Sequence, residues 1–154
     1  KYLNTAETPL FHKGDQFYGT LRAGTIPVIV EGPMDAIAVT LGSHARYTGL
    51  APLGTSLTNQ QAAVLQGHPD VYLLDVREPD EYDAGHIPGI TLIPMGEVAD
   101  RLSEIPTDRE VIVTCRTGNR SAQVTDFLRQ QGFTNVHNME GGIVAWEEAG
   151  YPVE

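Results

Sequence analysis

The chain has 154 residues, of which 41% are hydrophobic and 7% aromatic, and its formal net charge is −10. This composition is typical of one soluble domain, or of one domain with an appendage, and every apolar run is shorter than the roughly 18 residues of a membrane helix. The polar start of the sequence shows no secretory signal, so we expect a cytoplasmic protein.

Charge is distributed unevenly along the sequence. Residues 1–70 hold four basic and five acidic side chains, a net of −1, whereas residues 71–154 hold six and fifteen, a net of −9. Proteins bind nucleic acids through clustered Lys and Arg side chains that contact phosphates. The acidic second half therefore argues against a nucleic-acid interface there.

The first half of the sequence predicts a short α/β segment. A strand over 27–31 precedes a helix over 34–41 and a strand near 46–51. These elements are too few to close an α/β core of their own. We therefore expect the strands to pack on the rest of the chain or on a partner protein, or to remain loose.

From residue 58 onward, helices alternate with short apolar strands. Thr58 is a good N-cap and Gly67 a good stop for the first helix. The alternation predicts a mostly parallel sheet with helices on both faces. The predicted elements are helix 58–66, strand 71–75, turns over 79–90, a short strand near 91–93, helix 97–104, strand 111–115, helix 121–131, a strand near 135–138 and helix 142–149. On helix 121–131 we expect one face to carry Val124, Phe127, Leu128 and Gln131.

The most informative stretch joins strand 111–115 to helix 121–131. Its first residue is Cys115, the only cysteine, at the carboxyl end of a strand, where open α/β sheets place their ligands. Arg116 and Arg120 add positive charge, and the first N–H groups of the helix face back toward the sulfur. Such surroundings lower the pKa of a cysteine from about 8.5. We therefore predict a Cys115 thiolate, and a Ser121 that caps the helix and also faces the sulfur.

The alternative is that Cys115 is a small apolar side chain that fills the end of the strand, as most lone cysteines do. A single cysteine excludes an internal disulfide and provides no resolving thiol. An acceptor for any group carried on its sulfur must therefore come from outside the chain.

Four motifs between residues 56 and 154 resemble the rhodanese family, in its single-domain sulfurtransferase type. They are LDVREPDEY at 74–82, YDAGHIPGI at 82–90, the active loop CRTGNRS at 115–121, and MEGGIVAW at 139–146. The resemblance implies a rhodanese-like three-layer sandwich, with a mostly parallel central sheet flanked by helices. It also implies an enzyme similar to thiosulfate:cyanide sulfurtransferases, which moves a sulfane sulfur from thiosulfate or a persulfide to a thiol or cyanide.

The same resemblance assigns roles within the active loop. Cys115 is the catalytic nucleophile and becomes a persulfide, Arg116 and Arg120 orient a small anionic donor, and the N–H groups of the loop hold the persulfide anion. No metal or organic cofactor is needed. The expected donor-binding residues are Arg116, Thr117, Gly118, Asn119, Arg120 and Ser121.

Two other functions remain open for this half. Protein phosphatases with a related arrangement place five residues between cysteine and arginine, whereas Cys115 and Arg120 enclose four. The tighter ring of N–H donors suits a sulfane sulfur better than a phosphoryl group, and Thr114 stands where such phosphatases usually carry a histidine. A non-catalytic rhodanese module for partner docking or redox sensing is the other alternative.

Further residues of this half have a structural interpretation. We expect His86 to tie a turn together rather than to act as a base. Asp75 and Arg77 are expected to form an internal ion pair that braces a turn, and Trp146 to lie in the core.

The first half resembles bacterial DNA primases and their toprim domain. The stretches that carry this resemblance are 1–14, 28–38 and 53–58, and helix 58–66 fits a toprim domain as well as it fits a rhodanese. In the primase family, the glutamate that matches Glu31 serves in phosphoryl transfer, and a later Asp-x-Asp pair holds Mg²⁺. The corresponding strand here offers Asp75 and Arg77, and a guanidinium repels Mg²⁺.

We therefore interpret residues 1–66 as a truncated toprim-like segment that overlaps the rhodanese. The domain boundary is expected near residue 55, with a partial toprim-like α/β segment at 1–55 and a rhodanese domain at 56–154. A protein partner for the first segment fits this interpretation, and a fragment of a toprim-type primase is the alternative function. Because the sequence begins at Lys1 inside a motif, we expect a piece of something longer.

Overall fold

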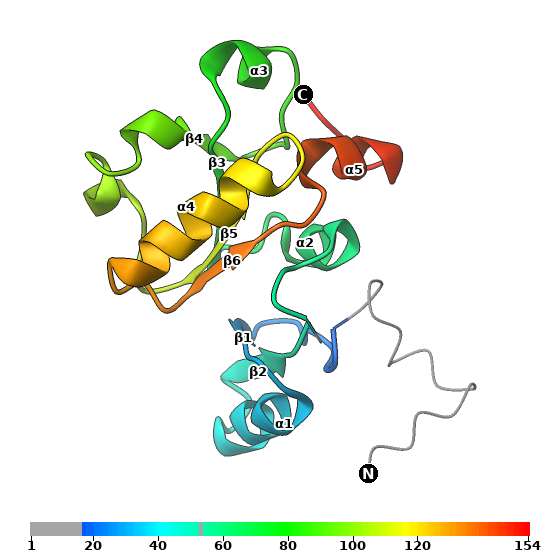
Figure 1. The fold of residues 1–154 in the computed structure, drawn as a ribbon. Helices are drawn as coiled ribbons and strands as arrows, with labels where there is room; N and C mark the ends of the chain where they lie inside the picture. The colour runs from blue at the N-terminus through cyan, green and yellow to red at the C-terminus, as the bar shows by residue number, and fades with distance from the viewer. Residues whose placement is uncertain (1–16, 53) are drawn as a thin grey trace. The chain divides into compact units, whose positions relative to one another are not determined.

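The computed structural model describes residues 17–52 and 54–154 (Figure 1). The chain divides into two compact units between Thr55 and Ser56. The primase-like stretch at 1–14 lies outside the described residues. Within the described ranges, every helix is too short or too polar to cross a bilayer.

The first unit contains a two-stranded parallel sheet and one helix. Strand β1 (Ile26–Ile29) pairs with strand β2 (Tyr47–Leu50), and helix α1 (Pro33–Gly42) connects them. A Cβ atom added to Gly49 would lie 2.4 Å from the carbonyl oxygen of Ala36, so the glycine lets α1 pack directly on β2. All three elements predicted for this half are confirmed to within two residues at each end.

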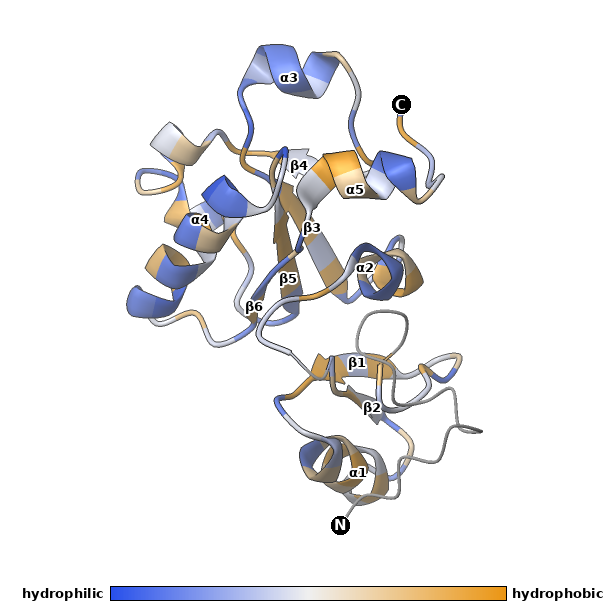
Figure 2. Ribbon diagram, turned by 45° about the vertical axis from the view of Figure 1, so that its right-hand side comes forward, coloured by the Kyte–Doolittle hydropathy of each residue, from blue (hydrophilic) through white to orange (hydrophobic). Residues whose placement is uncertain are grey.

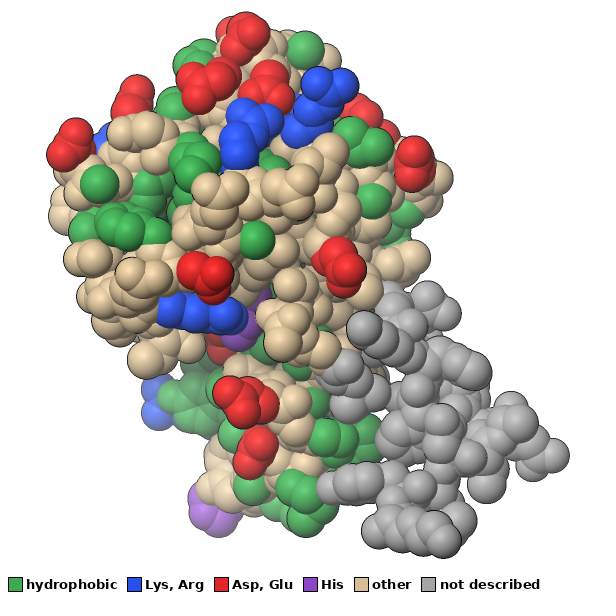
Figure 3. Space-filling view, in the orientation of Figure 1, with side chains coloured by type: hydrophobic (Ala, Val, Ile, Leu, Met, Phe, Trp, Pro, Cys, Tyr) green, Lys and Arg blue, Asp and Glu red, His purple; other side chains and the backbone are tan. Residues whose placement is uncertain are grey.

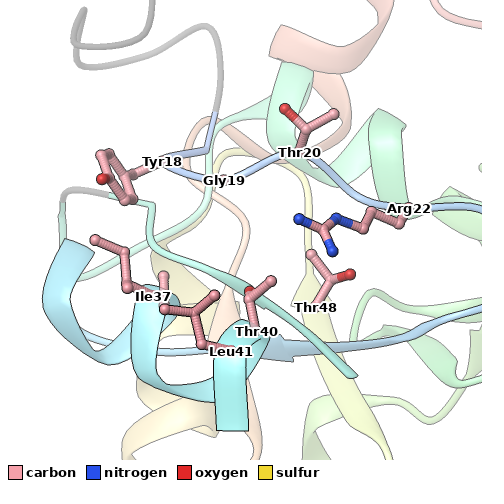
Figure 4. Close-up of a pocket in the computed structure, with 9 residues that line it drawn as sticks. Tyr18, Gly19, Thr20, Arg22, Ile37, Thr40, Leu41 and Thr48 are labelled. Atoms are coloured by element: carbon pink, nitrogen blue, oxygen red, sulfur yellow. The ribbon is translucent and has the colours of Figure 1, made fainter. Parts of the chain in front are cut away.

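A cavity of about 300 Å³ lies beside α1 in this unit. Figure 4 shows Ile37 and Leu41 of α1 on one side of it and the guanidinium of Arg22 on another. Next to the cavity, the hydroxyl groups of Thr25 and Thr48 share a buried hydrogen bond of 2.6 Å. The lining residues include neither a cysteine nor an acidic side chain.

The second unit is a three-layer α/β domain. Its four parallel strands stand in the order β4-β3-β5-β6. Figure 2 shows helix α4 on one face of the sheet and helices α2 and α5 on the other. The elements are α2 (Asn59–Leu65), β3 (Val71–Asp75), α3 (Pro79–Asp83), β4 (Thr91–Leu92), β5 (Glu110–Thr114), α4 (Asn119–Gln130), β6 (Val136–Asn138) and α5 (Gly142–Glu148). The predicted parallel sheet with helices on both faces is confirmed.

The core of this domain lies between the sheet and its helices. Strand β5 is buried at all five residues, as expected for a central parallel strand covered on both faces. Val124 and Leu128 of α4 belong to the buried hydrophobic cluster of this core, and the partly buried Phe127 packs against that cluster. Gln131, expected on the same face, is exposed. Trp146 is 1% exposed and donates its indole N–H to the carbonyl of Pro152 at 2.9 Å, so its predicted place in the core is confirmed.

Two predicted segments are wrong in detail. The helix expected over 97–104 is a pair of 3₁₀ turns, Met95–Glu97 and Leu102–Glu104. Arg101, between them, has φ −114° and ψ 21°, which interrupts the helix and allows both Val98 and Ile105 to be buried. The turns expected over 79–90 contain α3, whose start carries Pro79 at the first helical position.

Candidate active site

Cys115 directly follows β5, at the carboxyl edge of the sheet. Strands β3 and β5 pair in parallel register with Asp75 opposite Thr114, so the end of β3 lies beside the start of the active loop. The loop then turns into α4 (Figure 1). This is the edge at which open parallel sheets bind their ligands.

Hydrogen-bond donors surround the sulfur of Cys115. The N–H of Gly118 donates to it at 3.1 Å, and the hydroxyl of Ser121 donates at 3.4 Å. Burial raises the pKa of the Cys115 thiol, but the Ser121 hydroxyl and the N–H groups of Ser121, Thr117 and Gly118 together lower the pKa below its ordinary value. The arrangement therefore favours a thiolate over a thiol.

The start of α4 differs from the prediction. Gly118, not Ser121, is the N-cap, with φ 93° in the left-handed region. Ser121 is the third residue of the helix, and its hydroxyl turns toward the sulfur. The predicted capping role of Ser121 is wrong, because the helix begins two residues earlier, and its predicted approach to the sulfur is confirmed.

Helix α5 fixes the backbone of the active loop from the other side. The N–H groups of Ile143 and Val144 donate to the carbonyls of Cys115 and Arg116 at 2.9 and 3.1 Å. A Cβ atom added to Gly142, which has φ 60°, would lie 2.4 Å from the Cys115 carbonyl oxygen. The glycine pair of the 139–146 motif thus permits a close approach that shapes the loop.

The two arginines of the loop have different surroundings. Arg120 forms a double hydrogen bond with Glu81 of α3, and both nitrogen–oxygen distances are 2.7 Å. This pairing is the main cause that lowers the pKa of Glu81 to about 2. Arg116 is exposed and lines a cavity of about 260 Å³ together with Glu81 and Glu147. In Figure 3, basic side chains lie among acidic ones at the end of the domain that carries α3.

The remaining predicted residues lie in the same loop and at the first turn of α4. Thr117 is exposed and contributes its backbone N–H to the sulfur. Asn119 is the first residue of α4, and its carbonyl accepts a hydrogen bond from Gln123. The sequence did not identify Glu81 as part of the site. The nearby sequence indicates for Glu81 only a role in helix capping, and in the structure its carboxylate accepts the N–H of Glu78 at 3.2 Å.

The polar side chains interpreted as structural brace the turn beside the loop. Arg77 holds Asp75 with three hydrogen bonds of 2.7 to 3.0 Å and donates to the carbonyls of Glu81 and Gly85. His86 stacks on Tyr82, with ring centroids 3.8 Å apart, and contacts the Tyr82 carbonyl. The predicted ion pair between Asp75 and Arg77 is confirmed, and so is the prediction that His86 ties a turn together.

Metal binding is the remaining question of site chemistry. In residues 17–52 and 54–154, no three His, Cys, Asp or Glu side chains gather in a way that would hold a metal ion. That the chemistry needs neither metal nor organic cofactor stays a prediction.

The chain belongs to the rhodanese-like domain family, whose model matches residues 58–149. A sulfurtransferase from Allochromatium vinosum is 46% identical over 84 residues, which are 54% of this chain and 78% of that protein. The thiosulfate sulfurtransferase GlpE from Pseudoalteromonas translucida is 37% identical over 89 residues, 58% of this chain and 85% of that protein. The crystal structure of a rhodanese-related protein from Thermoplasma volcanium matches with a TM-score of 0.58 and 37% identity, covering 66% of this chain and 98% of that one.

These comparisons confirm the rhodanese-like fold and link the chain to a family with named sulfurtransferases. The family match starts at residue 58 and lends no support to a toprim-like first half. That resemblance stays a prediction from the sequence.

Proposed function

We propose that the chain is a sulfurtransferase that carries a sulfane sulfur as a persulfide on Cys115. The observation that carries this proposal is the set of donors aimed at one sulfur atom: the Gly118 N–H at 3.1 Å and the Ser121 hydroxyl at 3.4 Å. Donors fixed in this way stabilise negative charge on sulfur before a substrate arrives. The family's sulfurtransferases support the same chemistry.

The reaction has two half-steps. The Cys115 thiolate attacks the outer sulfur of the donor, a new S–S bond forms, and the donor's S–S bond breaks. Its electron pair leaves with sulfite when the donor is thiosulfate, or with a thiolate when the donor is a persulfide. A thiol or cyanide then attacks the outer sulfur of the Cys115 persulfide and regenerates the Cys115 thiolate, with thiocyanate as the product in the case of cyanide.

The other loop residues have roles in this scheme. The N–H groups of Thr117, Gly118 and Ser121 hold the persulfide anion, and Arg116 attracts the anionic donor. Asn119 and Arg120 complete the loop that the donor contacts. Because Cys115 is 1% exposed, the donor must present a small, accessible outer sulfur.

Intact-protein mass spectrometry tests the proposal. After incubation with thiosulfate or with a small persulfide, we expect the protein to gain one sulfur atom and to lose it on addition of cyanide. Cys115→Ser must abolish the gain. A wild-type protein that gains no sulfur from either donor at saturation would instead be a docking or sensing module, and release of inorganic phosphate from a phosphoryl ester would favour the phosphatase alternative.

We also infer from the sequence that residues 1–55 are a partial toprim-like segment, that residues 56–154 are the rhodanese domain, and that the protein works in the cytoplasm. The absent Asp-x-Asp pair argues against metal-dependent catalysis by the first segment. A polymerisation assay with Mg²⁺ and nucleoside triphosphates tests this point, and nucleotide incorporation would contradict it.

A further inference from the structure

The carboxylate of Glu81 pairs with the Arg120 guanidinium, which would otherwise be available to bind a donor anion. Its two carboxylate oxygens accept from both terminal nitrogens of Arg120 at 2.7 Å, across 39 residues of sequence. Glu81 is the main cause that raises the pKa of the Arg120 guanidinium, and the charge of Cys115 raises it further. The carboxylate of Glu81 thus takes up the two terminal nitrogens with which Arg120 could bind a sulfonate or carboxylate.

Pairing leaves little positive charge at the mouth of the loop. Arg77 is committed to Asp75, and Arg120 is committed to Glu81. Arg116 lines the adjacent cavity, and within the described ranges it has no ion-pair partner. Glu81 and Glu147 line the same cavity, so the guanidinium of Arg116 has acidic side chains nearby. Such surroundings attract the first negative charge of a donor weakly, and they attract a second charge on the same donor less than the first.

We propose that Glu81 determines the charge of the sulfur donor by neutralising Arg120. This inference rests on the sulfurtransferase activity proposed above. Singly charged donors, such as small persulfides and thiosulfonates, are the preferred substrates over a dianion such as thiosulfate. Glu81 acts on the donor through Arg120 and is a positioning residue.

The test compares two donors that differ by one charge. Thiosulfate is a dianion that leaves sulfite, and methanethiosulfonate is a monoanion that leaves methanesulfinate. Sulfur loading is followed by intact mass at a series of donor concentrations, which separates the half-saturating concentration from the limiting rate. The variants are Glu81→Gln and, as a control with the same change of net charge, Glu97→Gln, which loses an exposed pair with Arg101.

Freeing Arg120 should lower the half-saturating thiosulfate concentration by about three- to fivefold, the range expected for a partly exposed ion pair. For methanethiosulfonate the decrease should be about twofold, because the interaction scales with the donor charge. The limiting rate should stay unchanged, and Glu97→Gln should match the wild type.

Two results would overturn the inference. One is an unchanged half-saturating concentration for thiosulfate in Glu81→Gln. The other is an equal fall in limiting rate for both donors together with a lower melting temperature, which would identify the pair as a purely structural clamp between α3 and the loop. If the wild-type protein gains sulfur from neither donor, it is the proposed function itself that fails, and this inference fails with it.

Discussion

Replacing Ser121 with alanine deletes the hydroxyl that donates to the Cys115 sulfur at 3.4 Å. Ser121 is fully buried, so water does not replace the lost donor. A hydrogen bond to a charged group contributes about 1.5–3 kcal/mol, and the length of this one places it near the lower end. A loss of about 1.5 kcal/mol reduces the thiolate population about tenfold at pH values below the pKa of the thiol.

Reactivity changes less than the thiolate population, because a less stabilised thiolate is a better nucleophile. With a Brønsted coefficient of about 0.4–0.5, the variant should react with iodoacetamide about three- to fourfold more slowly at low pH. At high pH, where both proteins are fully ionised, it should react about threefold faster. The two rate–pH profiles must therefore cross.

The assay is the alkylation rate of Cys115 against pH, followed by intact mass. Thr125→Val is the matched control, since Thr125 has a buried hydroxyl on the same helix that makes no hydrogen bond within the described residues. This control should leave the profile unchanged. A Ser121→Ala profile that superimposes on the wild type would show that the backbone N–H groups alone stabilise the thiolate, and would refute the reasoning.

Three further predictions concern stability and pH. Arg77→Met leaves the carboxylate of Asp75, which is 0% exposed, without its partner, and should lower the free energy of unfolding by about 3–5 kcal/mol in a urea titration. Gly142→Ala should abolish sulfur loading and lower the melting temperature. Gly150→Ala is the control, because Gly150 has a similar φ of 78° but a Cβ there would meet no atom within 4 Å, and it should only lower the melting temperature. The pKa of the Cys115 thiol is lower in the folded protein, so its ionisation should stabilise the fold fully above about pH 8.5. This contribution should be lost as pH falls through the pKa of the folded protein. Cys115→Ser should remove this pH dependence from the free energy of unfolding.

The parts of the site that depend on neighbouring residues in sequence were predictable. Strand β5 has three consecutive apolar residues at its centre and ends at Thr114, directly before the cysteine, and the loop and helix that follow are contiguous with it. Local patterns of this kind place Cys115 at the edge of the sheet and turn N–H groups toward it. The capping of α2 by Thr58 is equally local, and the structure confirms it through a capping box with Gln61.

The parts that depend on tertiary contacts were not predictable. Nothing near Arg120 in sequence indicates Glu81, and the short helix α3 that carries Glu81 was expected as a turn. Helix α4 begins at Asn119, earlier than expected, because Gly118 adopts a left-handed conformation. A Cβ placed on Gly118 would lie 3.0 Å from the Gly141 nitrogen and 3.3 Å from the Met139 carbonyl oxygen. A pattern of residues along the sequence gives no information about such a tertiary contact.

The dependence of the loop on α5 has a consequence for biosynthesis. A ribosome produces Cys115 before Ile143 and Val144, whose N–H groups bind the Cys115 and Arg116 carbonyls. Until these two residues emerge, the carbonyls of Cys115 and Arg116 lack their partners, and the loop backbone is not fixed from that side. The loop around the nucleophile can therefore reach its final shape only after α5 has been made, whereas the strand and the helix on either side of the loop come earlier.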